Sequence, residues 1–540
     1  MRKSLSVAVL LPLLVSAVML AALPWPAART SAQTPQPTPT PAAYVPQAQL
    51  CANGSNTLCS VLAAYIGPNP RLQKGFGYNG LYGAPPTQPS EDVQTPFDNM
   101  AWQMFVALNW AARGVDKPAA AGLTQAGPRV WQTYRKVSEL FGNSKVRAPC
   151  ASMLALPVFA IGSDGKGKPL PNNEEYLQAS TNRPLIDVNG NWTIFERRVN
   201  DVEAKYLLAP NGQASQTLTT IAGQKQFIAN NPDGAQFTSS ATVPDGANGS
   251  IEIKAAWRII DRTSGDDPSR FFTQLVFIAV PGDLVRGGRP FCRIERVGLV
   301  GLHILQRNPL DPKNPELLPQ WIWATFEHVD NAPLAQLPCS VANGCGKADP
   351  TKWINQPSCG AAAAVPLTHY SFYRRNPPPA LGTNIVPLPL LGTHTEYPWN
   401  RQQPYAHGAT SLATAMPQAT RCWEIYPTTQ QLNGQWQKAL GAVSSVLQNY
   451  MLVGTQWGGT VEPPTPPNPV PADAVPGMLS NITLETYIQN NTGKGNAPGS
   501  CVSCHNFAKL PADKKTSANF SFLPGLANPP TARSQIQTAQ

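Results

Sequence analysis

Two stretches of the chain carry apolar residues at the spacing of an amphipathic helix. In residues 95–113 the apolar face consists of Phe97, Ala101, Met104, Phe105 and Leu108. Thr95 is a suitable N-cap for this helix, and Pro96 suits the first turn because no backbone donor is needed there. In residues 434–452 the apolar face consists of Trp436, Leu440, Val443, Leu447 and Tyr450. The period predicts a helix in each stretch.

The centre of the chain shows a different pattern, short runs rich in β-branched and aromatic residues. These runs cover residues 250–260, 270–280, 292–306 and 320–329, and Gly, Pro, Asp and Asn residues separate them. Such runs are typical of strands. We therefore expect an α+β fold: a loop-rich body with a largely antiparallel sheet and flanking helices, followed by a short C-terminal helical tail.

The first 32 residues have the organisation of a secretory signal peptide. Arg2 and Lys3 form a basic start, residues 5–23 are apolar and uncharged, and small residues precede a cleavage point after Ala32. Two prolines follow the apolar run, at the place where a signal peptide is cut. We expect cleavage and export, with an uncleaved membrane anchor as the alternative. Residues 33–47 then form a Pro-rich spacer.

Proline density marks another boundary near the C-terminus. Residues 462–477, EPPTPPNPVPADAVPG, cannot continue a helix or a central strand, so they are expected to form a semi-rigid linker. The linker separates a body over residues 48–461 from a C-terminal segment over residues 478–540. This segment is predicted to begin with a short helix that is capped by Ser480 or Asn481.

The composition and the net charge limit the classes of protein to which this chain can belong. A hydrophobic content of 42% with 57 Pro and 41 Gly in 540 residues indicates a globular, loop-rich chain. The net charge of +10 falls to +7 without residues 1–32, which hold three basic residues and no acid. So small a balance does not favour nucleic-acid binding. Residues 491–540 hold five basic residues and one acid, which forms either a solvated tail or a basic rim for an acidic partner.

Ten cysteines in an exported chain point to an oxidising compartment. Eight of them lie before residue 500, and an even number suits structural disulfides. Cys51 with Cys59 and Cys339 with Cys345 are the first pairs to test, because each would close a short loop. None of the eight falls in a C-x-x-C pair, so a zinc site is not favoured among them.

The last two cysteines belong to a C-x-x-C-H motif, formed by Cys501, Cys504 and His505. At this composition the motif arises by chance in roughly 1 of 500 chains. Two thiols three positions apart can reach both vinyl groups of a haem, and the histidine that follows is then carried to the iron. A thioredoxin-like dithiol would need a strand-to-helix junction, and a zinc site would need a second ligand pair. The motif therefore predicts one covalent haem c.

The tail MLSNITLETYIQ…SCVSCHNFA…NFSFLPGLA resembles the C-terminal end of large secreted bacterial monohaem cytochromes of the c type. In the body, GSIEIKAAWR and QWIWATFEHVDN also resemble segments of such proteins. The resemblance implies that Cys501 and Cys504 form the thioethers and that His505 is the proximal iron ligand. It also implies a bacterial periplasmic or extracellular redox protein, but no particular reaction.

A sixth iron ligand is not evident, because residues 506–540 contain neither Met nor His. Met478 is the first candidate for the distal ligand, and a thioether there would favour electron transfer. His328 stands in a stretch that could line a haem pocket, with Trp321, Trp323, Phe326 and Glu327. The other candidates, for which a structural or surface role is the simpler interpretation, are Met451, His303, His328, His369, His394 and His407. A vacant sixth position stays open as well.

Three functions fit these features. The first is an electron-transfer cytochrome whose large body covers the haem, with a redox partner protein that could be acidic. The alternative is a peroxidase- or oxygenase-type enzyme with an open distal site, and the third is a structural protein whose haem fastens the tail. Glu252, Lys254, Glu327 and Asp330 could form a catalytic cluster, although solvated faces or buried ion pairs are simpler interpretations. No nucleic acid and no membrane beyond the signal segment are expected as partners.

Overall fold

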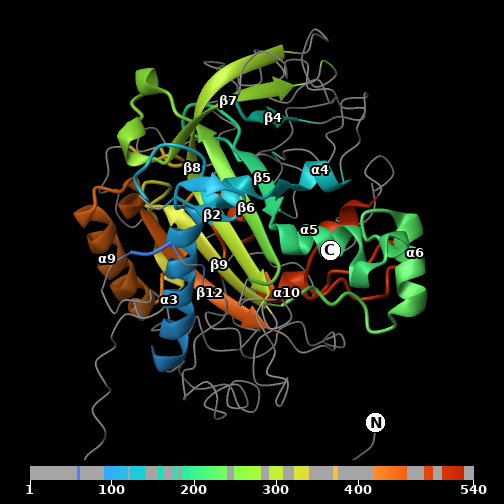
Figure 1. Cartoon of the computed structure of the whole chain (residues 1–540). Helices are drawn as coiled ribbons and strands as arrows, with labels where there is room; N and C mark the ends of the chain where they lie inside the picture. The colour runs from blue at the N-terminus through green and yellow to red at the C-terminus, as the bar shows by residue number, and fades with distance from the viewer. Residues whose placement is uncertain are drawn as a thin grey trace, which may run out of the picture. The chain divides into compact units, whose positions relative to one another are not determined.

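The computed structural model of the chain describes a core of secondary structure and its connections (Figure 1). The described residues are 58–60, 62, 91–119, 122–141, 156–161, 176, 178–179, 185–239, 248–280, 282, 291–307, 321–339, 369–374, 419–458, 479–489 and 501–527. All of them belong to one compact unit that extends from Pro46 to Gln540. The predicted signal peptide, the spacer, the linker and Met478 lie outside the described residues.

An eight-stranded sheet forms the centre of this unit, with β12, β9, β8, β6, β5 and β3 in spatial order. β7 pairs with the first half of β8, and β4 pairs with β7 in the one parallel contact of this sheet. The strands are β3 (Arg135–Lys136), β4 (Val158–Ala160), β5 (Ile194–Val199), β6 (Ile251–Ile259), β7 (Thr273–Val280), β8 (Phe291–Arg307), β9 (Trp321–His328) and β12 (Tyr450–Gly458). The four predicted strands and the largely antiparallel α+β class are therefore confirmed.

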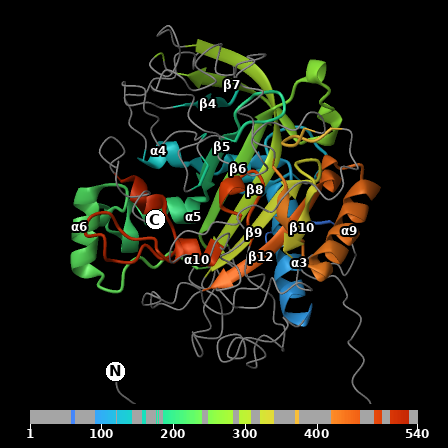
Figure 2. The same ribbon diagram turned by 180° about the vertical axis from the view of Figure 1, so that it is seen from behind.

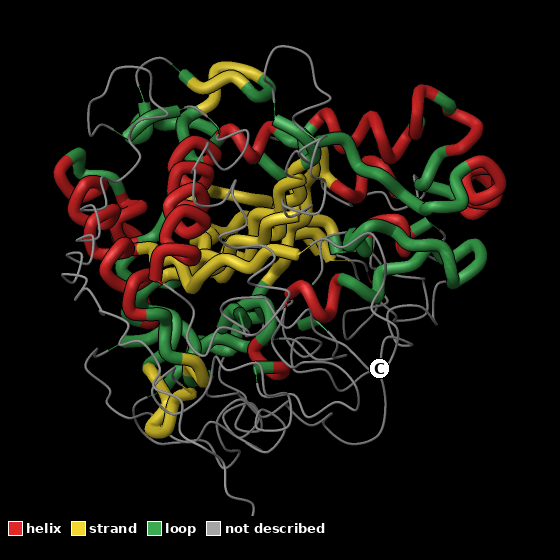
Figure 3. Tube along the Cα trace, turned by 90° about the horizontal axis from the view of Figure 1, so that it is seen from below, coloured by secondary structure: helices red, strands yellow, loops and turns green. Residues whose placement is uncertain are grey.

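Helices pack on both faces of the sheet (Figures 1 and 3). They are α3 (Glu91–Leu108), α4 (Val137–Phe141), α5 (Asp201–Leu208), α6 (Ile221–Asn230), α9 (Pro427–Ala442) and α10 (Cys501–His505). Two small sheets accompany them, β1 (Ala112–Gly114) with β2 (Lys117–Pro118) and β10 (Leu334–Cys339) with β11 (Arg421–Trp423). Among the described residues, no helix is long and apolar enough to cross a membrane.

The first face of the sheet is covered by α3 and α9. Trp102 and Phe105 of α3 pack with Leu440 of α9 and with Phe326 and Tyr450 of the sheet in one buried core. The second face meets residues 479–489 and 501–527 of the C-terminal part, together with α5 and α6 (Figure 2). Because successive strand residues point to opposite faces, Trp321 and Trp323 belong to this second core. We call the second surface the tail face.

Three predicted helices differ from the observed ones. The first begins at Glu91, so Thr95 lies inside it and is not its N-cap. The second ends at Ala442, since Ser444 adopts a left-handed φ of 54°. The chain then enters β12, so the expectation that Met451 ends a helix was wrong. Between residues 479 and 489 the chain forms turns and only one short 3₁₀ helix, Thr486–Ile488.

Candidate functional site

One helical turn carries all three residues of the C-x-x-C-H motif. α10 spans Cys501–His505, so the two cysteines stand three positions apart on the same helix. Both are free thiols, whereas Cys59, Cys292 and Cys422 are disulfide-bonded. Burial raises the pKa of Cys504 to about 11 and that of Cys501 well above its usual range. The thiols are therefore protonated at neutral pH, unlike the low-pKa thiolate of a redox-active dithiol.

The imidazole of His505 is held by a backbone carbonyl. Its Nδ1 lies 2.6 Å from the carbonyl oxygen of Phe520. A carbonyl can only accept, so Nδ1 carries the proton and donates it. Burial lowers the pKa of His505 to about 4, although the hydrogen bond to Phe520 acts in the opposite sense. The neutral ring therefore keeps its lone pair on Nε2, which is the arrangement of a metal-binding histidine.

A strained turn presents the Phe520 carbonyl. Asn519 and Phe520 have φ values of 51° and 65°, a region that a bulky side chain such as Phe rarely adopts. The turn is held from the sheet, because Trp321 Nε1 donates to Asn519 Oδ1 at 2.6 Å. Two further hydrogen bonds close it, from Ser521 N–H to the Ala518 carbonyl and from Asn519 N–H to Ser517 Oγ. The sheet thus fixes the acceptor that orients His505.

Aromatic rings surround His505 on the tail face. The rings of Trp323 and Phe522 lie 5.8 Å and 5.0 Å from its imidazole, measured between centroids. The ring of Phe520 packs against Trp323 at 5.5 Å. At the start of α10, the Val502 N–H donates to Gln456 Oε1 of β12 at 3.3 Å. The motif is therefore docked on β9 and β12.

A second tail segment, residues 479–489, lies on the same face beside α10. Asn481 Nδ2 donates to Thr325 Oγ1 at 2.7 Å and to the Phe326 carbonyl at 2.9 Å. Thr483 packs directly on Gly301, where any Cβ would lie 2.1 Å from Thr483 Oγ1. The predicted helix fails here because Asn481 instead accepts from the Thr483 N–H and bonds the sheet.

A buried ion pair fixes this segment further. Glu327 of β9 accepts from Arg421 of β11, through Oε1 at 3.2 Å and through a shorter contact to Oε2. Glu327 Oε1 also accepts from the Ile482 N–H at 2.6 Å. The three groups are buried, so β9, β11 and the tail segment are joined by one carboxylate.

Charged side chains lie on the tail face between the two tail segments. Lys254 of β6 and His303 of β8 are paired neighbours in the sheet. His303 Nε2 lies 2.8 Å from Glu485 Oε1, and Glu485 Oε2 accepts from the Asn481 N–H at 3.0 Å. Against the effect of burial, the charge and hydrogen bond of His303 lower the pKa of Glu485. The charges of all three side chains act on His505.

Unpaired buried donors test whether a haem fits these residues. Trp323 Nε1, Ser480 Oγ and Asn506 Nδ2 are buried, and no partner bonds them in the described part of the chain. Each belongs to a segment that borders Cys501–His505. Buried donors are costly when unpaired, and a haem brings two carboxylates that could accept from such groups. The free thiols, the Nε2 lone pair and these donors all fit a covalently held haem.

The other candidate ligands occupy different positions. His328 is buried, with Nδ1 accepting from the Asp330 N–H at 3.1 Å and Nε2 bonding the Arg270 carbonyl at 2.9 Å. Both nitrogens are therefore engaged, in agreement with a structural role. His369 bonds Asp266 at 2.8 Å. Met451 is half-buried in β12, and Met478, His394 and His407 lie outside the described residues.

The four residues considered as a catalytic cluster have separate partners. Glu327 pairs with Arg421, and Asp330 accepts from Arg270 Nη2 at 2.9 Å. Glu252 is buried on β6, and its charge adds to the effect of burial in raising the pKa of Glu203. Lys254 lies over the ring of Phe195 at 5.2 Å. Ion pairs thus account for two of them. The cysteine pairs proposed from loop length include Cys51 and Cys345, which lie outside the described residues.

Several residues of the site were not found from the sequence. Glu485 and the Phe520 carbonyl gave no motif, since they meet the site only through the fold. Of the residues named with His328 as a possible haem-pocket lining, Trp321, Trp323 and Glu327 face the tail, while Phe326 faces α3. Only the alternation along β9 could have separated them.

Comparison with protein-family models, with curated protein sequences and with solved structures gave no significant match. Within the described ranges, no group of three or more His, Cys, Asp and Glu side chains is arranged to hold a metal ion directly. The chemistry of the site therefore rests on the geometry around α10.

Proposed function

We propose that the protein is an exported electron-transfer cytochrome that carries one covalent haem c on Cys501 and Cys504. The observation that carries the proposal is the hydrogen bond that His505 Nδ1 donates to the Phe520 carbonyl. In the sequence, His505 directly follows the second of two free thiols, Cys501 and Cys504. This bond selects the tautomer that leaves Nε2 for iron. His328, by contrast, engages both of its nitrogens.

The chain's own residues would position the haem, exclude water from it and set the charge around it. When bound, the haem supplies a one-electron couple whose potential depends on the axial ligands, hydrogen bonds and burial. Cys501 and Cys504 would hold it, and His505 would bind the iron in an orientation set by Phe520. Trp323 and Phe522 would exclude water from that side of the ring, which reduces the reorganisation that a change of charge requires.

The basic tail supports an acidic partner. Lys514 and Lys515 are exposed, and Asp513 between the motif and these lysines is already bonded to the Lys515 and Thr516 N–H groups. A basic rim close to the redox centre would steer an acidic redox protein and make its association rate depend on salt. Export to the periplasm or the extracellular space would fit the N-terminal segment and the disulfides.

A second function, a peroxidase- or oxygenase-type enzyme, is supported by the His303–Glu485 pair. A histidine hydrogen-bonded to a carboxylate can act as a general acid and base, and this pair acts on His505 from the tail face. The second function requires a vacant sixth position at the iron, whereas electron transfer favours a filled one.

A redox titration of the exported protein with carbon monoxide separates the two functions. The electron-transfer proposal expects a reversible one-electron couple and a ferrous spectrum that carbon monoxide leaves unchanged. A ferrous spectrum that shifts with carbon monoxide would move the assignment to the enzyme. A chain with haem but no reversible couple would contradict the electron-transfer function.

A further inference from the structure

A tight turn in the tail presents the carbonyl group that holds His505. The Ser521 N–H donates to the Ala518 carbonyl at 3.2 Å and closes this turn. The two central residues, Asn519 and Phe520, have φ values of 51° and 65°. Positive φ at both central positions is typical of a type I′ turn, which favours Asn-Gly. Because Phe stands in place of the glycine, the turn needs contacts from elsewhere to offset its backbone strain.

The two tryptophans of β9 that face the tail supply such contacts. Trp321 Nε1 donates to Asn519 Oδ1 at 2.6 Å. The ring of Trp323 packs against that of Phe520, with 5.5 Å between their centroids. Trp321, Trp323 and Asn519 are buried, so bulk water does not compete for the hydrogen bond at Asn519 Oδ1. Each central residue of the turn is thus anchored to one tryptophan of the same strand.

The hydrogen bond from Trp321 links the turn to the body more closely than its neighbour does. A hairpin within the tail brings the chain to the turn, since the Ala518 N–H donates to the Ala508 carbonyl at 2.9 Å. Beyond this point the Asn519 side chain meets the body. Its Nδ2 donates to Gln236 Oε1 at 3.4 Å, which is long for a hydrogen bond, whereas the bond from Trp321 at 2.6 Å is short.

The hydrogen bond at His505 Nδ1 affects an iron bound at Nε2 through the imidazole ring. Donation of the Nδ1 proton to a carbonyl raises the basicity of the ring, and a more basic ligand favours ferric over ferrous iron. The Phe520 carbonyl, held 2.6 Å from Nδ1, therefore lowers the reduction potential relative to a carbonyl that has moved away.

We propose that Trp321 and Asn519 are positioning residues for the iron ligand, and that their hydrogen bond keeps the reduction potential of the haem low. This inference rests on the proposed function. The hydrogen bond holds the turn, the turn holds the Phe520 carbonyl against His505, and the imidazole carries the effect to the iron. The body of the protein thus sets the potential of a haem that is attached to its tail.

The test is the midpoint potential of exported haem protein in three variants. Trp321→Phe removes the N–H donor and keeps an aromatic ring in the contact with Phe237. We expect the equilibrium constant for reduction to rise about tenfold, which is about 59 mV for one electron. Asn519→Ala removes the acceptor and should also raise the potential. Because both variants break one hydrogen bond, Trp321→Phe should add no further rise in the Asn519→Ala background. Additive rises would overturn the proposal.

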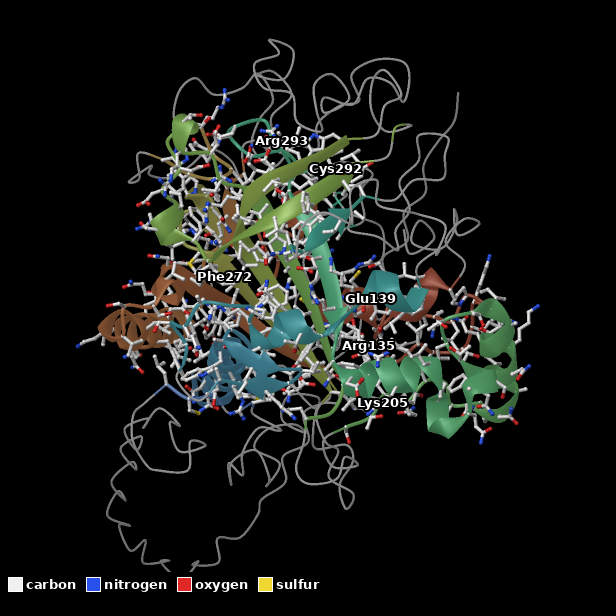
Figure 4. All side chains as sticks on the ribbon, turned by 45° about the horizontal axis from the view of Figure 1, so that its top comes forward. Arg135, Glu139, Lys205, Phe272, Cys292 and Arg293 are labelled. Carbon is white, nitrogen blue, oxygen red and sulfur yellow. The ribbon has the colours of Figure 1, made fainter. Side chains whose placement is uncertain are left out.

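Trp102→Phe is the matched control. Trp102 Nε1 donates to Asn433 Oδ1 at 2.9 Å, so this variant also loses a buried hydrogen bond from a tryptophan to an asparagine. Trp102 belongs to the core on the α3 side of the sheet, which also holds Phe272 (Figure 4). Trp102→Phe should lose a similar amount of stability in urea and keep the wild-type potential. An equal rise in potential in both tryptophan variants would overturn a specific role for Trp321.

Phe520→Gly provides a test of the turn itself. Glycine is favoured at the second central position of a type I′ turn, so this variant should keep the turn without its anchor. In the Phe520→Gly background, Trp321→Phe should therefore shift the potential much less than in the wild type. A shift of the same size in both backgrounds would overturn the role of the turn.

Haem content, measured first, separates this inference from the proposed function. An unchanged potential in haem-loaded Trp321→Phe would overturn the positioning role alone. A wild type without haem would overturn the proposed function, and nitrogen NMR of histidine-labelled protein, assigned with His505→Gln, would then test the positioning by itself. The wild type should carry the proton on His505 Nδ1, and Trp321→Phe should populate both tautomers. A tautomer that Trp321→Phe leaves unchanged would contradict the positioning.

Discussion

Substitution of Gly301 by alanine tests how the tail is seated on the sheet. Gly301 lies in the middle of β8, between Ala256 of β6 and Glu327 of β9. An added Cβ would lie 2.1 Å from Thr483 Oγ1 and 3.1 Å from Asn481 Oδ1. Thr483 cannot turn away cheaply, because its Oγ1 donates to Asn481 Oδ1 at 2.7 Å. We expect Gly301→Ala to lower the free energy of unfolding by about 1–3 kcal/mol, the usual cost of overpacking.

Thr483→Ala gives the second arm of a double-mutant cycle. Alone it should cost about 1 kcal/mol for the lost buried hydrogen bond. In the double variant the nearest remaining group of residue 483 is its Cβ, at 3.4 Å from the new methyl group, an ordinary contact. The two changes should therefore cost less together than separately, with a coupling of about 1 kcal/mol or more.

Urea unfolding of the exported protein measures these free energies, and protease digestion followed by mass measurement detects release of the tail. Gly434→Ala in α9 is the control, because nothing lies within 4 Å of its added Cβ. Alanine there should be neutral or slightly stabilising. Additive costs for Gly301→Ala and Thr483→Ala would refute the contact between β8 and the tail segment.

Two further predictions concern buried charges. Glu327→Ala leaves the Arg421 guanidinium and the Ile482 N–H without their shared acceptor, so urea unfolding should show a loss of about 3–5 kcal/mol; a loss below 1 kcal/mol would contradict the buried pair. Burial lowers the pKa of His328 to about 4, and the charge of Asp330 opposes this effect only in part. Below pH 6.5 the His328 of the unfolded chain therefore binds a proton that the folded protein does not bind. The free energy of unfolding should fall as the pH drops from 6.5 towards 4. The total is roughly 3 kcal/mol at about 1.4 kcal/mol per pKa unit, and His328→Gln should remove this part of the pH dependence, whereas an unchanged dependence would exclude His328 as its source.

The sheet could be predicted from the sequence, and the second helix could be predicted only in part. β6, β8 and β9 each alternate between two buried faces and are rich in β-branched and aromatic residues, so local pattern was sufficient. The apolar spacing from Trp436 continued through Tyr450, yet the helix stops at Ala442. The left-handed Ser444 and the pairing of Tyr450 with His328 decide the change to a strand, and pairing is not visible in a local period.

The candidate site, too, could be predicted only where a local sequence pattern encodes it. Cys501, Cys504 and His505 form a contiguous motif, so their chemistry could be predicted from spacing. The carbonyl of Phe520 is a backbone atom without a residue signature, and Glu485 lies 182 residues away in sequence from the His303 that it bonds. Tertiary packing alone brings these groups together. The predicted helix at residues 478–491 failed for a related reason, since Asn481 bonds the sheet instead of its own turn.

The measurement that tests the central proposal most directly is the haem content of the exported protein, by pyridine haemochrome together with the mass of the intact chain. The proposal predicts one haem c per chain in the wild type, retained after denaturation, and none in the Cys501→Ala/Cys504→Ala variant exported in the same way. A wild-type chain that was made alongside haem c maturation and yet carries no covalent haem would contradict it.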